Sequence, residues 1–464
     1  MGGLFLTKGE FMIFSSITFL YIFLPLCLFF YYISPKKVKN ITLLIFSLIF
    51  YSFQTPKFLP IMLGCIFLTY INALLIQKFE NKIHYFLSLI ICMFPLIIFK
   101  YLDFFIINTN SLFKTNITLL KLVLPLGISF YTFQMLSYLI DVKRKKTPAE
   151  KNILDLALYI CFFPQLVAGP IVKYDDIKEQ IHNKKINIEN FSNGVLIFAV
   201  GLGKKVLIAN QLGEMCELYT AGNSTIVFTW MYMIGYSLQV YFDFSGYSTM
   251  AIGLGKMFGF ELPENFNYPF ICSNIKDFWK RWHITLSSFF KEYVYIPLGG
   301  SRCSAIRNVF NLFVVWALTG FWHGANWNFI CWGLFFFVLL LIEKYIIKDK
   351  WPKILQRILT VFMVGISFVI FGATNMNDIF ITVKNLFMGT FIDSNTTFIL
   401  RNNTLLLIFS IIGATPLLRN IYSGFIKETK ISVIIEPLLI AILIIISTAY
   451  LIDGSFNPFL YFRF

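Results

Sequence analysis

Two histidines in apolar or aromatic surroundings are the residues of this chain best suited to chemistry. His323 lies in the stretch Trp322-His323-Gly324-Ala325-Asn326-Trp327, with apolar runs at 309–318 and 329–342 on either side. His283 lies 40 residues earlier, beside tryptophan and basic residues. An imidazole has an unperturbed pKa of about 6.5 and accepts a proton near neutral pH. Because apolar surroundings penalise polar groups, a titratable residue there usually marks a pathway or a reaction centre. A structural imidazole, hydrogen-bonded between helices, is the alternative.

The composition indicates what surrounds these histidines. Of the 464 residues, 57% are hydrophobic and 14% are charged, whereas soluble domains average about 45–50% and about 25%. The chain is therefore expected to be an integral membrane protein of the all-α class, with roughly 11–13 membrane helices of about 20 residues. Some runs are short enough to be re-entrant or interfacial helices. The apolar runs are 13–33, 41–53, 58–76, 85–107, 119–140, 153–168, 194–208, 225–241, 306–321, 328–347, 355–371, 405–418 and 431–452.

The net charge of +15 has a simple explanation in a membrane protein. The basic residues cluster in short loops, at 36–39, 78–82 and 143–146. By the positive-inside rule these loops face the cytoplasm, where they attract anionic membrane lipids. A soluble basic domain is missing from the pattern, so no nucleic-acid partner is expected. The eight cysteines show neither Cys-x-x-Cys pairs nor metal-ligand spacing, so no metal site is expected.

The chain shows neither an internal repeat nor a linker that would divide it. We expect a single membrane domain, 1–464, with residues 1–11 as an N-terminal extension and 454–464 as an aromatic C-terminal tail. Residues 265–304 mix aromatic, basic and turn residues and are interpreted as a buried excursion. They belong to the region 263–342, in which both histidines lie and which we take as the catalytic core region.

Several motifs in fixed order resemble one protein family. They are Phe14-Ser15-Ser16, the stretches 125–134 (PLGISFYTFQ), 163–171 (FPQLVAGPI) and 241–248 (YFDFSGYS), and the stretches 263–269 (PENFNYP), 277–287 (DFWKRWHITLS) and 293–300 (YVYIPLGG). Together they resemble the membrane-bound O-acyltransferase family, in particular the bacterial branch that O-acetylates alginate, peptidoglycan and other exopolysaccharides. The resemblance covers nearly the whole chain.

The resemblance implies a helical bundle around a central tunnel and an O-acetyltransferase activity. The enzyme would take an acetyl group from cytoplasmic acetyl-CoA, a substrate and not a permanently bound cofactor. It would pass this group across the bacterial inner (cytoplasmic) membrane for O-acetylation of an extracytoplasmic glycan. The chain shows no large domain for binding a polymer. A separately encoded, esterase-like acetyltransferase on the outer side is therefore an expected partner, and contact with the glycan acceptor would be indirect.

The resemblance also assigns roles to residues. Acyl transfer to a hydroxyl needs a base, and His323 matches the family's buried catalytic histidine. His283 matches the second, more polar active-site position, where it would polarise or orient the donor. Gly320 and Gly324 are expected to leave room for a substrate chain beside the backbone.

The four residues that directly precede His283 are predicted to bind the acyl donor. The cations would bind the phosphates of coenzyme A, and the aromatic ring faces would contact its adenine. The four residues are Trp279, Lys280, Arg281 and Trp282. An interfacial aromatic belt is the alternative. Three further residues are predicted to support the histidines: Asp243, Trp322 and Asn326. Asp243 would orient an imidazole or pair with Arg281, and a structural ion pair is the alternative.

The tail contains Tyr461 within Phe459-Leu460-Tyr461-Phe462. In related acyl-transfer systems a C-terminal Phe-x-Tyr motif is thought to carry the acyl group on its tyrosine. Tyr461 is thus a candidate acyl relay, because an aryl ester has a good leaving group. An aromatic anchor at the membrane interface is the ordinary explanation.

Other functions fit parts of the pattern. The same fold could transfer D-alanine to teichoic acid from a carrier-protein thioester, although 293–300 and the tail look more like the acetylating branch. A glycan transporter or flippase without covalent chemistry would favour repeated halves and several charged groups along its path. A purely structural envelope protein would not require two histidines in these settings.

Overall fold

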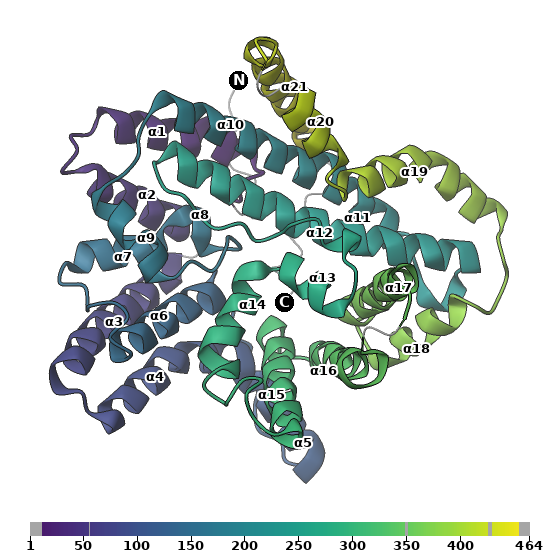
Figure 1. The fold of residues 1–464 in the computed structure, drawn as a ribbon, viewed down its shortest axis with the longest axis horizontal. Coiled ribbons are helices and arrows are strands. Elements are labelled where there is room, and N and C mark those ends of the chain that lie inside the picture. The colour runs from purple at the N-terminus through teal and green to yellow at the C-terminus, as the bar shows by residue number, and fades with distance from the viewer. Residues whose placement is uncertain (1–11, 55, 349–350, 426–428, 454–464) are drawn as a thin grey trace. The chain divides into compact units, whose positions relative to one another are not determined.

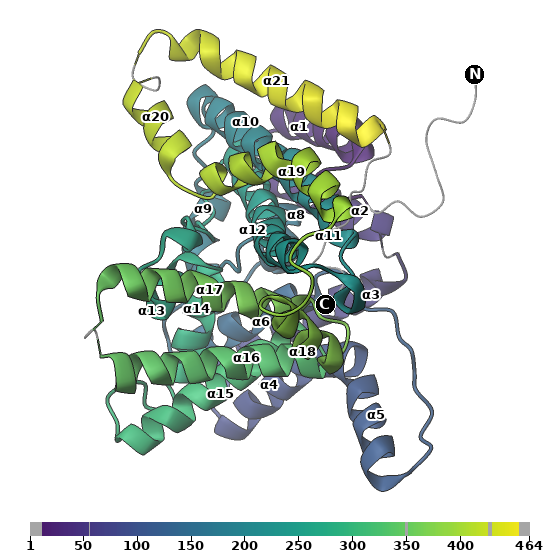
Figure 2. The ribbon, with the colours of Figure 1, turned by 90° about the vertical axis from the view of Figure 1, so that its right-hand side faces the viewer.

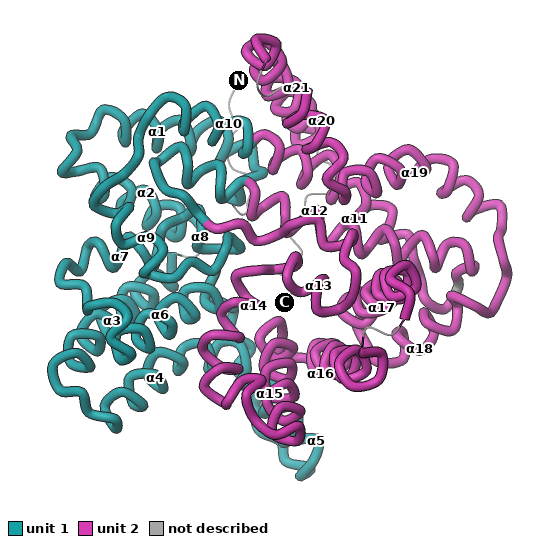
Figure 3. Tube along the Cα trace, in the orientation of Figure 1, with its two compact units in different colours: residues 1–198, 250–262 teal, residues 199–249, 263–464 magenta. Residues whose placement is uncertain are grey.

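The computed structural model describes residues 12–54, 56–348, 351–425 and 429–453 (Figure 1). Throughout these residues the secondary structure is helical, without a strand. The chain divides into two compact units, shown in Figure 3: residues 1–198 with 250–262, and residues 199–249 with 263–464. The prediction of an all-α multi-pass membrane protein is confirmed by the helices described below.

Unit 1 is built from the N-terminal helices. They are α1 (Leu24–Ile33), α2 (Lys39–Gln54), α3 (Leu59–Phe79), α4 (Lys82–Leu96), α5 (Leu102–Phe113), α6 (Ile128–Lys143), α7 (Ile153–Cys161), α8 (Phe163–Leu166), α9 (Tyr174–His182) and most of α10 (Ile188–Gly203). The last turns of α12 (Ile226–Met257) also belong to it.

Unit 2 contains the remaining helices. They are α11 (Asn210–Glu217), the first part of α12, α13 (Ile275–Arg281), α14 (Ile284–Phe290), α15 (Ala305–His323), α16 (Trp327–Leu341), α17 (Lys353–Gly372), α18 (Met376–Asn385), α19 (Ser394–Gly413), α20 (Leu417–Phe425) and α21 (Ser432–Ile452). Two π-helical segments matter below, η4 (Lys204–Ala209) and η7 (Lys291–Tyr295).

Eight helices of the described chain are long and apolar enough to cross a membrane. They cover 56–79, 82–113, 188–217, 305–323, 327–347, 353–372, 394–413 and 432–452. Two shorter apolar helices cover 19–33 and 39–53. The chain is therefore a multi-pass membrane protein.

Two of the predicted apolar runs are not single helices. In the run 119–140, the helix begins only at Ile128, after Gly127 with a φ of +68°. In the run 153–168, α7 ends at Cys161, and α8 is a single turn that contains Pro164. Proline lacks an N–H and its ring clashes with the carbonyl four residues earlier, so one helix cannot pass through this position undisturbed.

Within unit 1, the ends of several helices meet at basic loops. Lys143 Nζ donates to the carbonyl of Glu80, and Lys145 forms an ion pair with the Glu80 carboxylate at 2.6 Å. Asn40, which follows the first basic loop, donates to Asp155 Oδ1 at 3.0 Å. The loops at 78–82 and 143–146 thus lie together.

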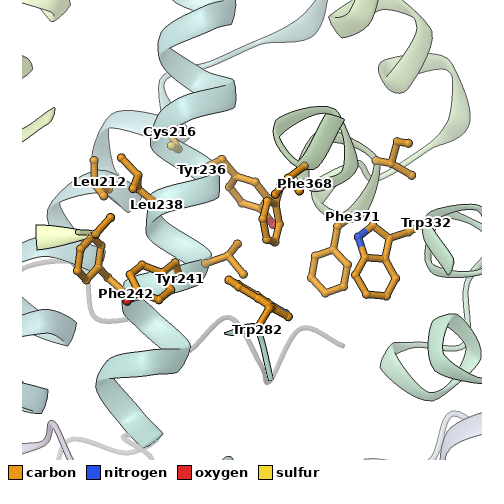
Figure 4. Close-up of a cluster of buried hydrophobic side chains, with 14 of the residues drawn as sticks. Leu212, Cys216, Tyr236, Leu238, Tyr241, Phe242, Trp282, Trp332, Phe368 and Phe371 are labelled. Atoms are coloured by element: carbon orange, nitrogen blue, oxygen red, sulfur yellow. The ribbon is translucent and has the colours of Figure 1, made fainter. Parts of the chain in front are cut away.

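In unit 2, α15, α16 and α17 pack in sequence, as Figure 2 shows. Their inner faces join α12 and α13 in a core rich in aromatic residues. Figure 4 shows part of this core, with Trp332 beside Phe371 and Trp282 between them and Tyr241. Large aromatic side chains bury much apolar area, and contacts between ring edges and faces add about 0.5–1.5 kcal/mol for each pair. Trp332 and Phe371 of this core contact His323.

Candidate active site

His323 is the last residue of α15 and is 5% exposed. Its ring is enclosed by aromatic rings. The centroid distances are 4.9 Å to Trp322, 4.9 Å to Trp332 and 5.5 Å to Phe371. Trp332 and Phe371 come from α16 and α17, so three helices position the imidazole. A weakly solvated site of this kind strengthens interactions with charge that develops during a reaction.

Glycines allow α15 and α16 to approach closely beside His323. A Cβ at Gly320 would collide with the carbonyl of Phe329, and a Cβ at Gly324 would collide with the Phe329 ring. The Cα of Gly320 would also be only 3.1 Å from a Cβ built at Gly333. Small residues permit such contact between membrane helices. The expectation that Gly320 and Gly324 leave room for a substrate chain is therefore wrong, because α16 fills that space.

His283 precedes α14 and is fully buried. Its backbone is left-handed, with a φ of +42°. This conformation costs a non-glycine residue roughly 1–2 kcal/mol and is often found at functional sites. Phe244 lies edge-on at 4.7 Å, and Phe266 stacks at 6.4 Å. Burial lowers the pKa of His283 to about 3, so the imidazole is neutral at physiological pH.

Trp322 brings the two histidines together. Its ring centroid lies 6.0 Å from that of His283 and 4.9 Å from that of His323. The tryptophan itself is 3% exposed. Two imidazoles that are 40 residues apart in sequence therefore flank one indole.

The predicted donor-binding residues separate into different environments. Trp279 is buried and lines a cavity, whereas Lys280 is exposed. Arg281 Nε forms an ion pair with Asp277 at 3.1 Å, and its Nη1 donates to the carbonyl of Asn267. Trp282 stacks on Phe278 at 5.6 Å within the core. Packing occupies the ring of Trp282 in this structure, and its role in binding the donor stays a prediction.

The cavity lined by Trp279 has a volume of about 150 Å³ and lies between α14 with η7 and one face of α15. The residues from α15 are Leu312, Val315, Trp316 and Thr319. Their spacing follows a single helix face, and four residues further along that face lies His323. Trp332 contacts both Trp279, at 5.8 Å, and His323, at 4.9 Å. One indole thus connects the wall of the cavity with the imidazole.

The cavity also has polar groups. Its lining includes Ser287, Lys291 and Tyr295. Lys291 is exposed, and the Tyr295 hydroxyl accepts a hydrogen bond from Asn308 at 2.8 Å. An apolar chamber with a cation and a few hydroxyls at its border suits a ligand that is largely apolar and carries a polar or anionic part.

Two of the predicted supporting residues make contacts other than those expected. Asp243 forms a buried ion pair with Lys205, with 2.5 Å between Nζ and Oδ1, and Arg281 pairs with Asp277 instead. Asn326 is exposed, and its side chain accepts from the N–H of Trp327 to cap α16. The recorded contacts of Asp243 and Asn326 thus stabilise the fold, and Trp322 is the one of the three that contacts both imidazoles.

Sequence reasoning missed two buried asparagines near the histidines. Asn265 Oδ1 lies 3.0 Å from His283 Nδ1. Asn328 donates to the carbonyls of Phe371 and Ala373, both at 3.1 Å, and so fixes the end of α17 that presents Phe371 to His323. In the sequence, both asparagines lie within aromatic or apolar stretches, and this could have identified them as candidate site residues. Tyr461 and the segments 1–11 and 454–464 lie outside the described residues.

The cysteines and other ligand types form no metal cluster in the part of the chain that the structure describes. All eight cysteines are free thiols, six of them buried. They act as small apolar residues in the packing.

Comparison with known proteins places the site in a family context. The family model for the membrane-bound O-acyltransferase family matches residues 143–376. A probable alginate O-acetylase of Pseudomonas aeruginosa is 38% identical over 79% of this chain and 73% of its own length. A peptidoglycan O-acetyltransferase of Helicobacter pylori is 37% identical over 81% and 80%. A teichoic acid D-alanyltransferase of Bacillus subtilis is 30% identical over 54% and 69%.

Proposed function

Because this chain belongs to the membrane-bound O-acyltransferase family and is an acyltransferase, we propose that it uses acetyl-CoA to O-acetylate an extracytoplasmic glycan. The names of two relatives, an alginate O-acetylase and a peptidoglycan O-acetyltransferase, support this acceptor class. The structural observation that carries the proposal is the position of His323. It lies buried against Trp322, whose ring also contacts His283, and it follows the α15 face that lines the cavity.

The proposed reaction assigns the proton transfers to His323. The attacking hydroxyl oxygen bonds to the thioester carbonyl carbon as its proton passes to the imidazole. The carbon–sulfur bond then breaks, and the thiolate of coenzyme A takes the proton from the imidazolium. Positioned proton transfer of this kind contributes about 10²–10⁴-fold to a rate. The products are the acetyl ester and free coenzyme A, and the imidazole returns to its neutral form.

A direct comparison of donors tests the proposal against its nearest alternative. Membranes containing the protein should transfer label from acetyl-CoA and not from a D-alanyl carrier protein. The reverse preference would indicate the reaction named for the Bacillus subtilis relative. A glycan flippase would use neither donor. It would release neither free coenzyme A nor the free thiol of the carrier protein, and this separates that class from both enzymes.

The cavity beside Trp279 is proposed to hold the acyl-bearing arm of the donor. Leu312→Trp should fill this space and raise the KM for acetyl-CoA about tenfold, which corresponds to about 1.4 kcal/mol of binding free energy. Phe310→Trp is the matched control, because Phe310 is 49% exposed and does not line the cavity. An unchanged KM in Leu312→Trp, with the protein folded, would exclude the cavity as the donor site.

We further propose that Tyr461 relays the acetyl group toward a separately encoded, esterase-like acetyltransferase outside the inner membrane. The tyrosine oxygen would displace coenzyme A to form an aryl ester, which a second hydroxyl then cleaves. Tyr461→Phe removes only the ester-forming oxygen and should abolish O-acetyl ester on the glycan. Full retention of glycan acetylation in this variant would exclude the relay without affecting the role of His323.

A further inference from the structure

The tautomer of His283 is determined by the residues that hold Asn265. The backbone N–H of Thr285 donates to the side-chain oxygen of Asn265, with a distance of 3.2 Å, and the Thr285 hydroxyl donates to the same oxygen at 2.9 Å. A backbone N–H can only donate, so the atom that faces it must be the amide oxygen and not the amide nitrogen. The same oxygen lies 3.0 Å from His283 Nδ1. Nδ1 must therefore carry the hydrogen.

The neutral imidazole then has its lone pair on Nε2. In the described part of the chain, Nε2 has no hydrogen-bond partner, although the residue is fully buried. Leaving a buried acceptor without a hydrogen bond is unfavourable. Such a cost is expected where a ligand completes the hydrogen bond.

The backbone around Asn265 holds this arrangement in place. The N–H of Ile284 donates to the carbonyl of Asn265 at 3.0 Å, and the N–H of Asn267 donates to the carbonyl of Arg281 at 2.9 Å. These two bonds join 265–267 to 281–284 on both sides of His283. They also explain how the left-handed backbone of His283 is maintained.

We propose that Asn265, held by Thr285, is a positioning residue that keeps His283 in the Nδ1–H tautomer, so that Nε2 accepts a hydrogen bond from a substrate N–H or O–H group. Of the two roles expected for His283, polarising a thioester carbonyl requires a donor at Nε2 and is excluded by this tautomer. The remaining role of His283 is to orient the substrate by accepting a hydrogen bond from one of its N–H or O–H groups. The proposal rests on the acyltransferase function proposed above and adds a residue and a direction of hydrogen bonding to it.

The surroundings of His283 contain few charges that could affect its titration. The groups in contact with its ring are Asn265, Phe244, Phe266 and Trp322. The nearest titratable residues along these elements are Glu264, exposed directly before Asn265; Asp243, paired with Lys205 beside Phe244; Arg281, paired with Asp277; and His323, on the other side of Trp322. A carboxylate introduced at position 265 would therefore be a new anion in direct contact with Nδ1.

The tautomer can be observed without an activity assay. The chain has only four histidines, so NMR of protein labelled at the histidine ring nitrogens can assign His283 by its loss in His283→Gln. The expected spectrum shows a protonated Nδ1 and a pyridine-like Nε2 at neutral pH. A protonated Nε2 in the folded wild-type protein would overturn the proposal, whatever the fate of the acyltransferase function.

Asn265→Asp supplies the second measurement. Its carboxylate should stabilise the imidazolium and raise the pKa of His283 well above its low wild-type value. The protonated ring can no longer accept at Nε2, so the activity of the variant should fall as the pH drops through this raised pKa. The wild-type protein should not show this decline, because its His283 stays neutral there. Asn267→Asp, an exposed position on the same segment, should keep the wild-type profile. If NMR shows a raised pKa of His283 in Asn265→Asp but activity does not fall as the ring becomes protonated, Nε2 does not contact the substrate and the proposal fails.

Discussion

His323→Ala should reduce the O-acetyl ester content of the glycan by about 10²–10⁴-fold while the protein still inserts into the membrane. The expected size is the contribution of a positioned general base. Loss of the imidazole removes the group that takes the proton from the attacking hydroxyl. The measurement is acetate released from purified glycan by mild base, normalised to the amount of protein in the membrane.

His182→Ala provides the matched control, because His182 lies exposed at the end of α9. It should retain wild-type acetylation. Since His323 is enclosed by Trp322, Trp332 and Phe371, a folded protein can be verified by its aromatic fluorescence. Acetylation close to the wild-type level in a folded His323→Ala protein would remove the assignment of the base.

Lys205→Met should destabilise the protein by about 3–5 kcal/mol, the usual effect of removing one partner of a buried ion pair. The side chains of Lys205 and Asp243 are 2% and 4% exposed, and 2.5 Å separates Nζ from Oδ1. The pair joins η4 to α12 where the two helices are close, since a Cβ at Gly246 would lie 3.0 Å from the backbone of Lys205. Denaturant unfolding in mixed micelles measures the change.

Two further variants separate the ion pair from general effects of the substitution. The double variant Lys205→Met with Asp243→Asn removes both charges and should recover a large part of the lost stability. Lys178→Met breaks a partly exposed pair with Asp175, for which at most about 1 kcal/mol is expected. If Lys205→Met costs no more than Lys178→Met, the buried pair does not stabilise the fold.

The sequence was sufficient to predict the class of fold, because membrane helices leave a strong hydrophobic signal. The runs at 328–347 and 355–371 correspond closely to described spans. The run 153–168 does not, because apolar character continues past the break before Pro164. Hydropathy averages over a window, whereas a single proline determines where a helix stops.

The site was predictable only where a residue type is rare. Histidine in an apolar run is conspicuous, and the structure places both candidates beside Trp322. The partner of Asp243 was not predictable, because Lys205 and Arg281 are equally distant from it in the sequence and only the packing of the helices decides which cation reaches the carboxylate. The position of Asn265 in an aromatic stretch was a signal that could have been noticed, but its role depends on a hydrogen bond from the backbone of Thr285, which the sequence does not reveal.

The claim that an acetyl group passes the bilayer through a reaction at His323 is tested most directly in inside-out membrane vesicles. Radiolabelled acetyl-CoA is added to the cytoplasmic face, now outside, with the acceptor glycan and the proposed partner acetyltransferase enclosed. We predict base-labile label that an added esterase reaches only after detergent is present, and none in vesicles with His323→Ala. The mechanism would be contradicted if the His323→Ala vesicles were labelled inside to the same extent as the wild type. It would also be contradicted if the esterase removed the wild-type label without detergent.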